Sequence, residues 1–149
     1  MSLSGYANQI WENEFDSNTG ISETYIFYWL QNNIGNLNVL LNTEFVVSGD
    51  NFEPVFCAEE SGIYTQYFLK EYYKKESRKV LQNITSPLGQ VDWISLSEGD
   101  TTIKRNNRNE VAKTLIQQSK DAGIELKDLV FQYNYYKSGP RQVAGVDGN

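Results

Sequence analysis

The longest feature of this sequence is a helical repeat of apolar residues in its last third. The repeat runs through Val111, Leu115, Ile116, Ala122, Leu126, Leu129, Val130 and Tyr133. Asn107 and Glu110 have the spacing of a capping box, so the helix is expected to begin near Arg108, with a weak point or a break at Gly123. A helix of about thirty residues is about 40 Å long. This is more than a chain of 149 residues needs for its own core, so part of the helix is expected to pack on another molecule.

Two further segments show the same helical period. Ser22 is expected to cap a helix that begins at Glu23, and apolar residues recur behind it at three- and four-residue intervals. Asn32, Asn33 and Gly35 are expected to break this helix, which would give a hairpin of two short helices or one kinked helix. Residues 59–84 are the clearest helix, acidic at the start and basic toward the end, as the helix dipole favours.

The segments between and around these helices predict short extended pieces and two arms. Residues 43–47 are expected to form a loop or a short edge strand, and residues 91–96 a short strand or a buried loop. Residues 1–20 read as an N-terminal arm, and residues 138–149 as an extended C-terminal arm after one helical domain over residues 1–137. The predicted fold is therefore mainly α, a small helical bundle with a long C-terminal helix, short extended segments and extended N- and C-terminal arms.

The aromatic content is high, with ten Tyr, seven Phe and three Trp. Such residues suit surfaces that are buried on association, and they equally suit an aromatic core. Ile10, Trp11 and Phe15 are spaced to cover one side of a short helical turn or to fill a neighbour's groove, and Trp11 and Phe15 are candidates for a subunit interface. A further candidate for the subunit interface is the basic group Lys104, Arg105 and Arg108, which could bind acidic groups of a neighbour or DNA phosphates. The same residues are equally consistent with the solvated start of a helix.

The residue types needed for most catalysis are missing. The chain has no histidine, so a Ser-His-Asp or Cys-His arrangement is excluded, and so is the commonest metal ligand. It has no Gly-rich phosphate loop, and Glu98 and Asp100 read as part of a turn rather than as paired catalytic carboxylates. Its single Cys57 is expected to be a buried small apolar residue. We therefore expect no enzyme activity, no cofactor and no metal site.

The net charge and the hydropathy limit the partners. A net charge of −6 argues against general nucleic-acid binding, which needs a basic surface to replace phosphate counterions. No apolar run approaches the roughly 18–20 residues that span a bilayer, so no membrane partner is expected. The C-terminal arm holds three glycines and few core-forming residues, and it is expected to order only on a partner, for example as a strand added to a sheet edge.

Several stretches together resemble the head–tail connector (adaptor) proteins of tailed bacteriophages. They are Ser22-Glu23-Thr24-Tyr25 with Trp29-Leu30, Ile34-Gly35-Asn36-Leu37-Asn38 with Leu40-Leu41-Asn42-Thr43, Tyr67-Phe68-Leu69-Lys70-Glu71-Tyr72-Tyr73, Trp93-Ile94-Ser95-Leu96-Ser97-Glu98-Gly99-Asp100-Thr101-Thr102-Ile103, and Gln142-Val143-Ala144-Gly145-Val146-Asp147-Gly148. The likeness covers roughly residues 22–148. It is a match of pattern, since these proteins share no signature motif.

The resemblance implies a structural protein of the virion, made in the host cytoplasm and placed at the head–tail junction. Such proteins form a homo-oligomeric ring, commonly of twelve copies, which docks below the portal protein, links the capsid to the tail and lines the DNA channel. DNA then passes through without sequence-specific binding, and a downstream neck or tail protein binds the other side.

The resemblance also implies that the C-terminal arm reaches onto the portal. The portal-binding residues would be Gly139, Pro140, Arg141, Gln142, Val143, Ala144, Gly145, Val146, Asp147, Gly148 and Asn149. Two alternatives remain open. One is another neck or tail-completion (stopper) ring protein, and the other is a small non-catalytic regulatory binding domain.

Overall fold

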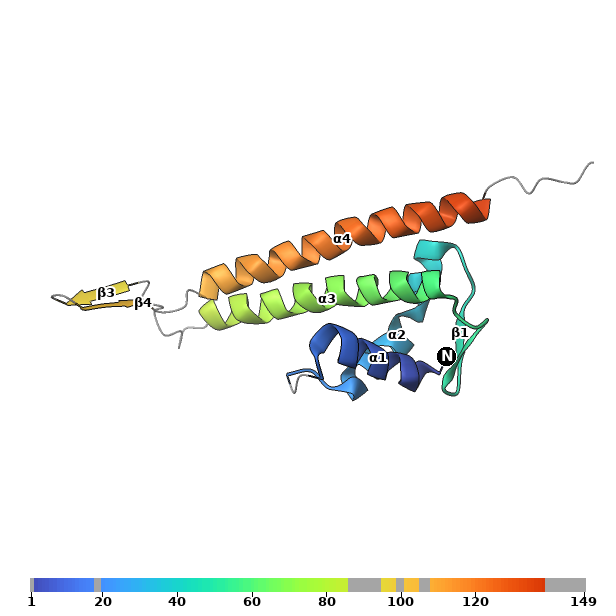
Figure 1. The fold of residues 1–149 in the computed structure, drawn as a ribbon, viewed down its shortest axis with the longest axis horizontal. Helices are drawn as coiled ribbons and strands as arrows, with labels where there is room; N and C mark the ends of the chain where they lie inside the picture. Colours follow the sequence, from blue (N-terminus) through green and yellow to red (C-terminus); the bar gives the residue numbers. More distant parts are fainter. Residues whose placement is uncertain (1, 18–19, 86–94, 99–100, 105–107, 139–149) are drawn as a thin grey trace, which may run out of the picture. The chain divides into compact units, whose positions relative to one another are not determined.

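The computed structural model describes residues 2–17, 20–85, 95–98, 101–104 and 108–138. The described elements are α1 (Leu3–Phe15), α2 (Glu23–Leu41), β1 (Val46–Ser48), β2 (Asn51–Glu53), α3 (Ala58–Thr85), β3 (Ser95–Glu98), β4 (Thr101–Lys104) and α4 (Arg108–Ser138) (Figure 1). The predicted mainly α fold, a small helical bundle with a long C-terminal helix, is confirmed. Residues 139–149 of the predicted C-terminal arm lie outside the described residues.

The chain forms two compact units. Unit 1 consists of Met1–Glu59 with Lys127–Asn149, and unit 2 consists of Glu60–Leu126. The boundaries between the units fall inside α3 and α4, each of which is one continuous helix. The single domain expected over residues 1–137 therefore stays a prediction.

Helix α1 of unit 1 occupies most of the segment that was expected to be an arm. Its residues Leu3, Tyr6, Ala7 and Ile10 are buried, and the helix packs against α2. The carboxylate of Asp50 fixes its first turn, because it accepts hydrogen bonds from the Ser4 backbone N–H at 2.8 Å and from the Ser4 hydroxyl. The prediction of an arm is thus wrong for Leu3–Phe15, since its apolar face packs against α2 and Asp50 holds its first turn, so this helix is part of the core.

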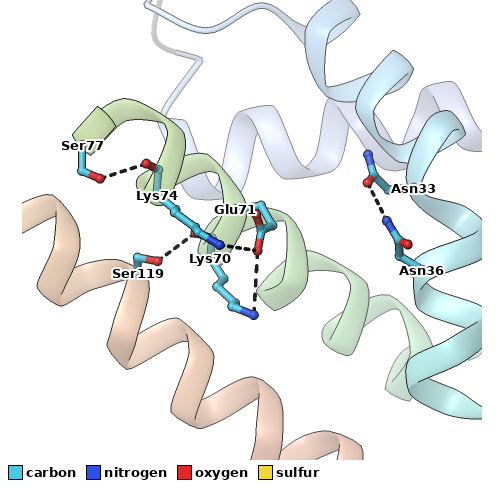
Figure 2. Close-up of polar contacts among 7 residues, drawn as sticks. All are labelled: Asn33, Asn36, Lys70, Glu71, Lys74, Ser77 and Ser119. Carbon is cyan, nitrogen blue, oxygen red and sulfur yellow. Dashed lines mark hydrogen bonds and ion pairs between the residues drawn. The ribbon is translucent and has the colours of Figure 1, made fainter. Parts of the chain in front are cut away.

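Helix α2 begins where the sequence predicts and does not break in the middle. The Ser22 hydroxyl oxygen accepts a hydrogen bond from the Tyr25 backbone N–H at 3.1 Å, and the helix runs unbroken to Leu41. The predicted break is wrong, since the burial of Leu30 and Leu37 on either side outweighs the cost of glycine, and the asparagine side chains bond within the helix. Asn33 donates to the carbonyl oxygen of Trp29 at 2.8 Å. Figure 2 shows that it also accepts from Asn36, at 3.1 Å.

A small antiparallel hairpin follows α2. Strands β1 and β2 pair Val47 with Phe52, and Gly49 in the turn has a φ of 63°, a conformation that glycine adopts without strain. Phe52 is buried, and its ring stacks on Phe56 at 4.0 Å between centroids, with Tyr6 edge-on at 6.1 Å. This aromatic cluster joins α1 to the segment before α3, so part of the aromatic content is core.

Replacing Asn38 with alanine is expected to destabilise the protein by about 1–3 kcal/mol. The Asn38 side chain donates to the carbonyl oxygen of Phe45 at 2.8 Å and accepts from the Phe45 N–H at 2.8 Å, so alanine would leave both part-buried groups unpaired. Chemical denaturation followed by circular dichroism measures the change. The control is Asn36→Ala, which removes an exposed hydrogen bond and should change stability by less than about 0.5 kcal/mol. Equal losses of stability in the two variants would show that the Asn38–Phe45 hydrogen bonds do not stabilise the fold.

In unit 2, a hydrogen bond joins α3 and α4. The Ser119 hydroxyl of α4 donates to the carbonyl oxygen of Lys70 on α3 at 3.0 Å (Figure 2). A methyl group at Gly123 would lie 3.7 Å from the Lys70 side chain, which is ordinary contact. Helix α4 continues through Gly123 for 31 residues, so the start near Arg108 and the great length are confirmed, and no break occurs there.

Replacing Gly123 with alanine is expected to stabilise the protein by about 0.5–1 kcal/mol. Alanine lowers the entropy of the unfolded chain and meets no close atom at this position. Thermal unfolding of the variant measures the gain. Gly49→Ala is the matched control, because its positive φ should make alanine cost about 1–2 kcal/mol. A destabilised Gly123→Ala variant would show that the space around Gly123 is too small for a methyl group.

Two short segments differ in detail from their predictions. Strands β3 and β4 pair antiparallel, with Glu98 opposite Thr101, so Glu98 ends a strand of a hairpin, while residues 91–94 and 99–100 lie outside the described residues. Cys57 is exposed, and the prediction that it is buried is wrong. It immediately precedes α3, where Phe56 fills the neighbouring buried position.

Candidate functional site

The last turns of α4, in unit 1, carry three exposed aromatic side chains. Phe131 is 70%, Tyr135 67% and Tyr136 80% exposed. Phe131 and Tyr135 are one helical turn apart, and their rings stack with centroids 6.2 Å apart, while Tyr136 meets Tyr135 edge-on at 6.0 Å. Because the rings touch one another, they form one continuous aromatic surface rather than scattered apolar residues.

The opposite side of the same turns is anchored. Tyr133 is buried, and the Asn134 side chain donates to the carbonyl oxygen of Leu40 in the last turn of α2 at 3.1 Å. The ammonium group of Lys137 lies 4.9 Å from the centroid of the Tyr133 ring, a cation–π distance. These contacts fix the rotation of α4 about its axis, so the three aromatic rings are held outward.

A groove of about 540 Å³ lies beside this surface. Its lining comes from the end of α2 and the end of α4, namely Leu41, Asn42, Thr43, Phe131, Tyr133, Asn134, Tyr135 and Lys137. We call this lining, together with Tyr136, the aromatic groove. The α2 side is shaped by its helix cap, since Asn42 has a left-handed backbone with a φ of 53° and its N–H bonds to the carbonyl oxygen of Asn38.

The chemistry of the aromatic groove suits binding. Among the described residues that line it, Lys137 is the one charged residue, and the other polar groups are amides, hydroxyls and backbone. Within the described part of the chain, no group of three His, Cys, Asp or Glu side chains is placed to hold a metal ion. Aromatic rings with a few fixed polar groups are the composition of protein-binding hot spots.

The structure places the predicted interface residues in different surroundings. Trp11 is half-buried, and its indole N–H donates to the carbonyl oxygen of Ile21 at 3.0 Å, so it holds α1 to the segment before α2. Phe15 is half-buried at the last residue of α1. Neither takes part in the aromatic groove, and both stay interface predictions.

The basic candidates and the C-terminal arm are only partly described. Lys104 is the last residue of β4 and Arg108 the first residue of α4, while Arg105 lies outside the described residues. All of the predicted portal-binding residues, Gly139 to Asn149, lie outside them too. Their predicted roles therefore stay predictions.

Sequence reasoning missed the aromatic groove. The sequence did contain a signal, because Phe131, Tyr135 and Tyr136 do not belong to the apolar repeat of Leu129, Val130 and Tyr133 that marks the packed side of α4. Large aromatic residues outside a helix's apolar stripe are expected to be exposed, and several together indicate a binding surface.

None of the helices in the described ranges combines the length and the apolar character needed to cross a membrane. Compared with known proteins, the chain matches no protein-family model, no curated protein sequence and no solved structure.

Proposed function

We propose that this chain is a head–tail connector (adaptor) subunit of a tailed bacteriophage. In this proposal, copies form a ring below the portal protein at the head–tail junction, link the capsid to the tail and surround the DNA channel. The chain performs no catalysis, and its work is to hold partners together.

The observation that carries this proposal is the exposed aromatic surface of Phe131, Tyr135 and Tyr136. A soluble protein rarely leaves three touching aromatic rings in water unless a partner covers them. The surface lies on the last two turns of α4, immediately before residues 139–149, the segment that the resemblance assigns to portal binding. The aromatic groove and this segment would together make one docking site for the portal.

The net charge supports the channel role. At −6 the chain repels DNA on average, and a repulsive lining lets a duplex slide where a basic lining would hold it. The same charge is less useful to a protein that must bind DNA tightly.

Mixing the purified protein with the portal protein of the same virus tests the proposal. Light scattering should show a complex, and negative-stain images should show a ring added to one face of the portal. The matched control lacks residues 138–149. It should keep nearly all its helix content by circular dichroism and lose docking.

Two results would count against the proposal. A full-length protein that stays monomeric and ignores the portal would overturn it. A protein that ignores the portal but docks on a tail or stopper ring would assign it to another part of the neck.

A further inference from the structure

Helix α2 of unit 1 exposes a face without charge. Residues 24–43 contain no Asp, Glu, Lys or Arg, although charged residues make up 21% of the whole chain. Six of these residues recur at intervals that place them on one side of the helix, and all six are exposed. We call them the α2 face: Tyr28, Gln31, Asn32, Gly35, Asn36 and Val39. The solvent side of a helix normally carries charged residues, whereas the core of a protein–protein interface is depleted of them.

The α2 face leaves two apolar side chains in water, one near each end. Val39 is 83% exposed and Tyr28 is 56% exposed. They are separated by about three helical turns, so they lie on the same side of α2. The Tyr28 ring meets the Phe27 ring edge-on, with centroids 5.4 Å apart. Contact with Phe27 therefore leaves more than half of Tyr28 available to a partner.

The middle of the α2 face is open and rich in amides. A methyl group at Gly35 would meet no atom within 4 Å, so nothing in the same copy covers the backbone there. A second helix can therefore approach α2 closely at this point. The Asn36 side chain donates to the Asn33 side-chain oxygen at 3.1 Å (Figure 2), which leaves the Asn36 side-chain oxygen as an acceptor.

We infer that a second copy of this chain docks on the α2 face through its own α2 face, with the two helices antiparallel. Such a pair has a two-fold axis, and here the axis passes midway between residues 33 and 34. The axis maps the α2 face onto itself. It places Tyr28 opposite Val39 of the second copy, Asn32 opposite Gly35, and Gln31 opposite Asn36.

The groups that meet in this arrangement suit one another. The Tyr28 ring covers the Val39 side chain of the second copy, so both apolar groups leave water. The Asn32 amide enters the space that Gly35 leaves, where it reaches the open backbone. The amides of Gln31 and Asn36 each carry a donor and an acceptor, so they can bond to each other.

The absence of charge selects a copy of the same face over a charged partner. A partner with charged residues at this place would bury them without an opposite charge, which is costly. The α2 face of a second copy brings neutral amides and apolar groups at the matching positions.

The inferred dimer goes beyond the proposed function and does not depend on it. A two-fold contact is complete with two copies, whereas a ring needs contacts between two different surfaces. The dimer is therefore a form of the free subunit. The α2 face shares no residue with the aromatic groove.

Sedimentation velocity of the full chain without portal tests the inference. Wild-type protein should form dimers and no larger species as its concentration rises. One helix face is a small interface, so the dimer should be weak and should require high protein concentration. Unit 1 contains three basic and ten acidic residues, a net charge of −7. Raising the salt from about 0.05 M to about 0.5 M should therefore leave the dimer as strong or strengthen it, because salt screens the repulsion between copies.

Two variants with matched controls locate the contact. Val39→Glu should weaken the dimer at least about tenfold, because it places a charge against Tyr28 of the second copy. Val55→Glu makes the same change at another exposed valine of unit 1 and should dimerise like wild type. Gly35→Gln should also prevent dimerisation, while Gly62→Gln, at an exposed and equally open glycine of α3, should not. Circular dichroism should show undiminished helix content in all four variants.

Mixing two variants tests the antiparallel arrangement. Tyr28→Lys and Val39→Glu should each dimerise poorly alone and should form a mixed dimer, because the new ammonium group then meets the new carboxylate. In a parallel pair residue 28 would face residue 28, and no mixed dimer would form.

Several results would overturn the inference. They are wild-type protein that is monomeric at every concentration or grows beyond dimers, a Val39→Glu variant that dimerises normally, and the absence of a mixed dimer. Portal docking of the Val39→Glu variant is measured separately, and normal docking would leave the proposed function standing in each of these cases.

Discussion

Replacing Phe52 with alanine is expected to cost about 3–5 kcal/mol of the free energy of unfolding. Phe52 is 1% exposed, and its ring stacks on Phe56 at 4.0 Å with an interplanar angle of 9°. Tyr6 meets both rings edge-on, at 6.1 Å and 6.4 Å. Alanine would leave a cavity where β2 joins α1, and the three-residue strands around it are too short to close the space.

The size of this effect matters because native proteins are stable by only about 5–15 kcal/mol. The variant should unfold at a clearly lower denaturant concentration and expose apolar surface. Urea denaturation followed by circular dichroism measures the loss. The matched control is Val55→Ala, since Val55 is 70% exposed three residues later and should change stability by less than about 0.5 kcal/mol. A loss below about 1 kcal/mol for Phe52→Ala would show that the aromatic cluster is not a core.

Replacing Phe131 and Tyr135 together with serine is expected to abolish partner binding and leave the fold intact. Both side chains are exposed in the free protein, so their loss should cost little stability. Aromatic anchors at the centre of an interface contribute about 2–4 kcal/mol each, so the paired change should weaken portal binding at least about a hundredfold. Biolayer interferometry against immobilised portal measures the affinity.

The control for this pair lies on the same helical turns. Gln132→Ser changes an exposed residue outside the aromatic groove and should leave both binding and stability unchanged. Tyr133→Ala should instead lower the free energy of unfolding, because Tyr133 is buried. Unchanged portal affinity in the serine pair would remove the aromatic groove from the docking site.

The helices were the easiest part of the fold to predict from the sequence, because the residues that specify them are close together in the chain. Ser22 beside Glu23 marks the start of α2, and the apolar repeat with the Asn107–Glu110 spacing marks the start of α4. These signals lie within a few residues of the feature that they specify. Helices α3 and α4 therefore appear at their predicted positions with small shifts at the ends.

The errors have physical causes that local patterns do not contain. Helix α1 has a local cap, because the Ser2 hydroxyl accepts a hydrogen bond from the Gly5 N–H, but its packing on α2 and its hydrogen bonds to Asp50, 46 residues from Ser4, come from distant segments. Helix α2 passes Gly35 without a break, because neighbouring turns bury Leu30 and Leu37 and packing outweighs the roughly 1 kcal/mol cost of glycine.

The aromatic groove was the part of the molecule that was hardest to predict from the sequence. The aromatic groove combines the end of α2 with the end of α4, and only the folded chain brings Asn134 to Leu40. The exposed rings could be suspected from their positions outside the apolar stripe of α4, but the groove beside them depends on the helix cap at Asn42. Surfaces built from distant segments need tertiary structure to be recognised.

The central claim is that this chain is a subunit of the phage neck, and imaging assembled particles tests it most directly. Virions that carry the subunit with a small tag would be imaged by electron microscopy after labelling of the tag. The label should lie at the head–tail junction, directly below the portal and in several copies around the DNA channel. Labels on the capsid surface or the tail tip, or particles without label, would contradict the claim.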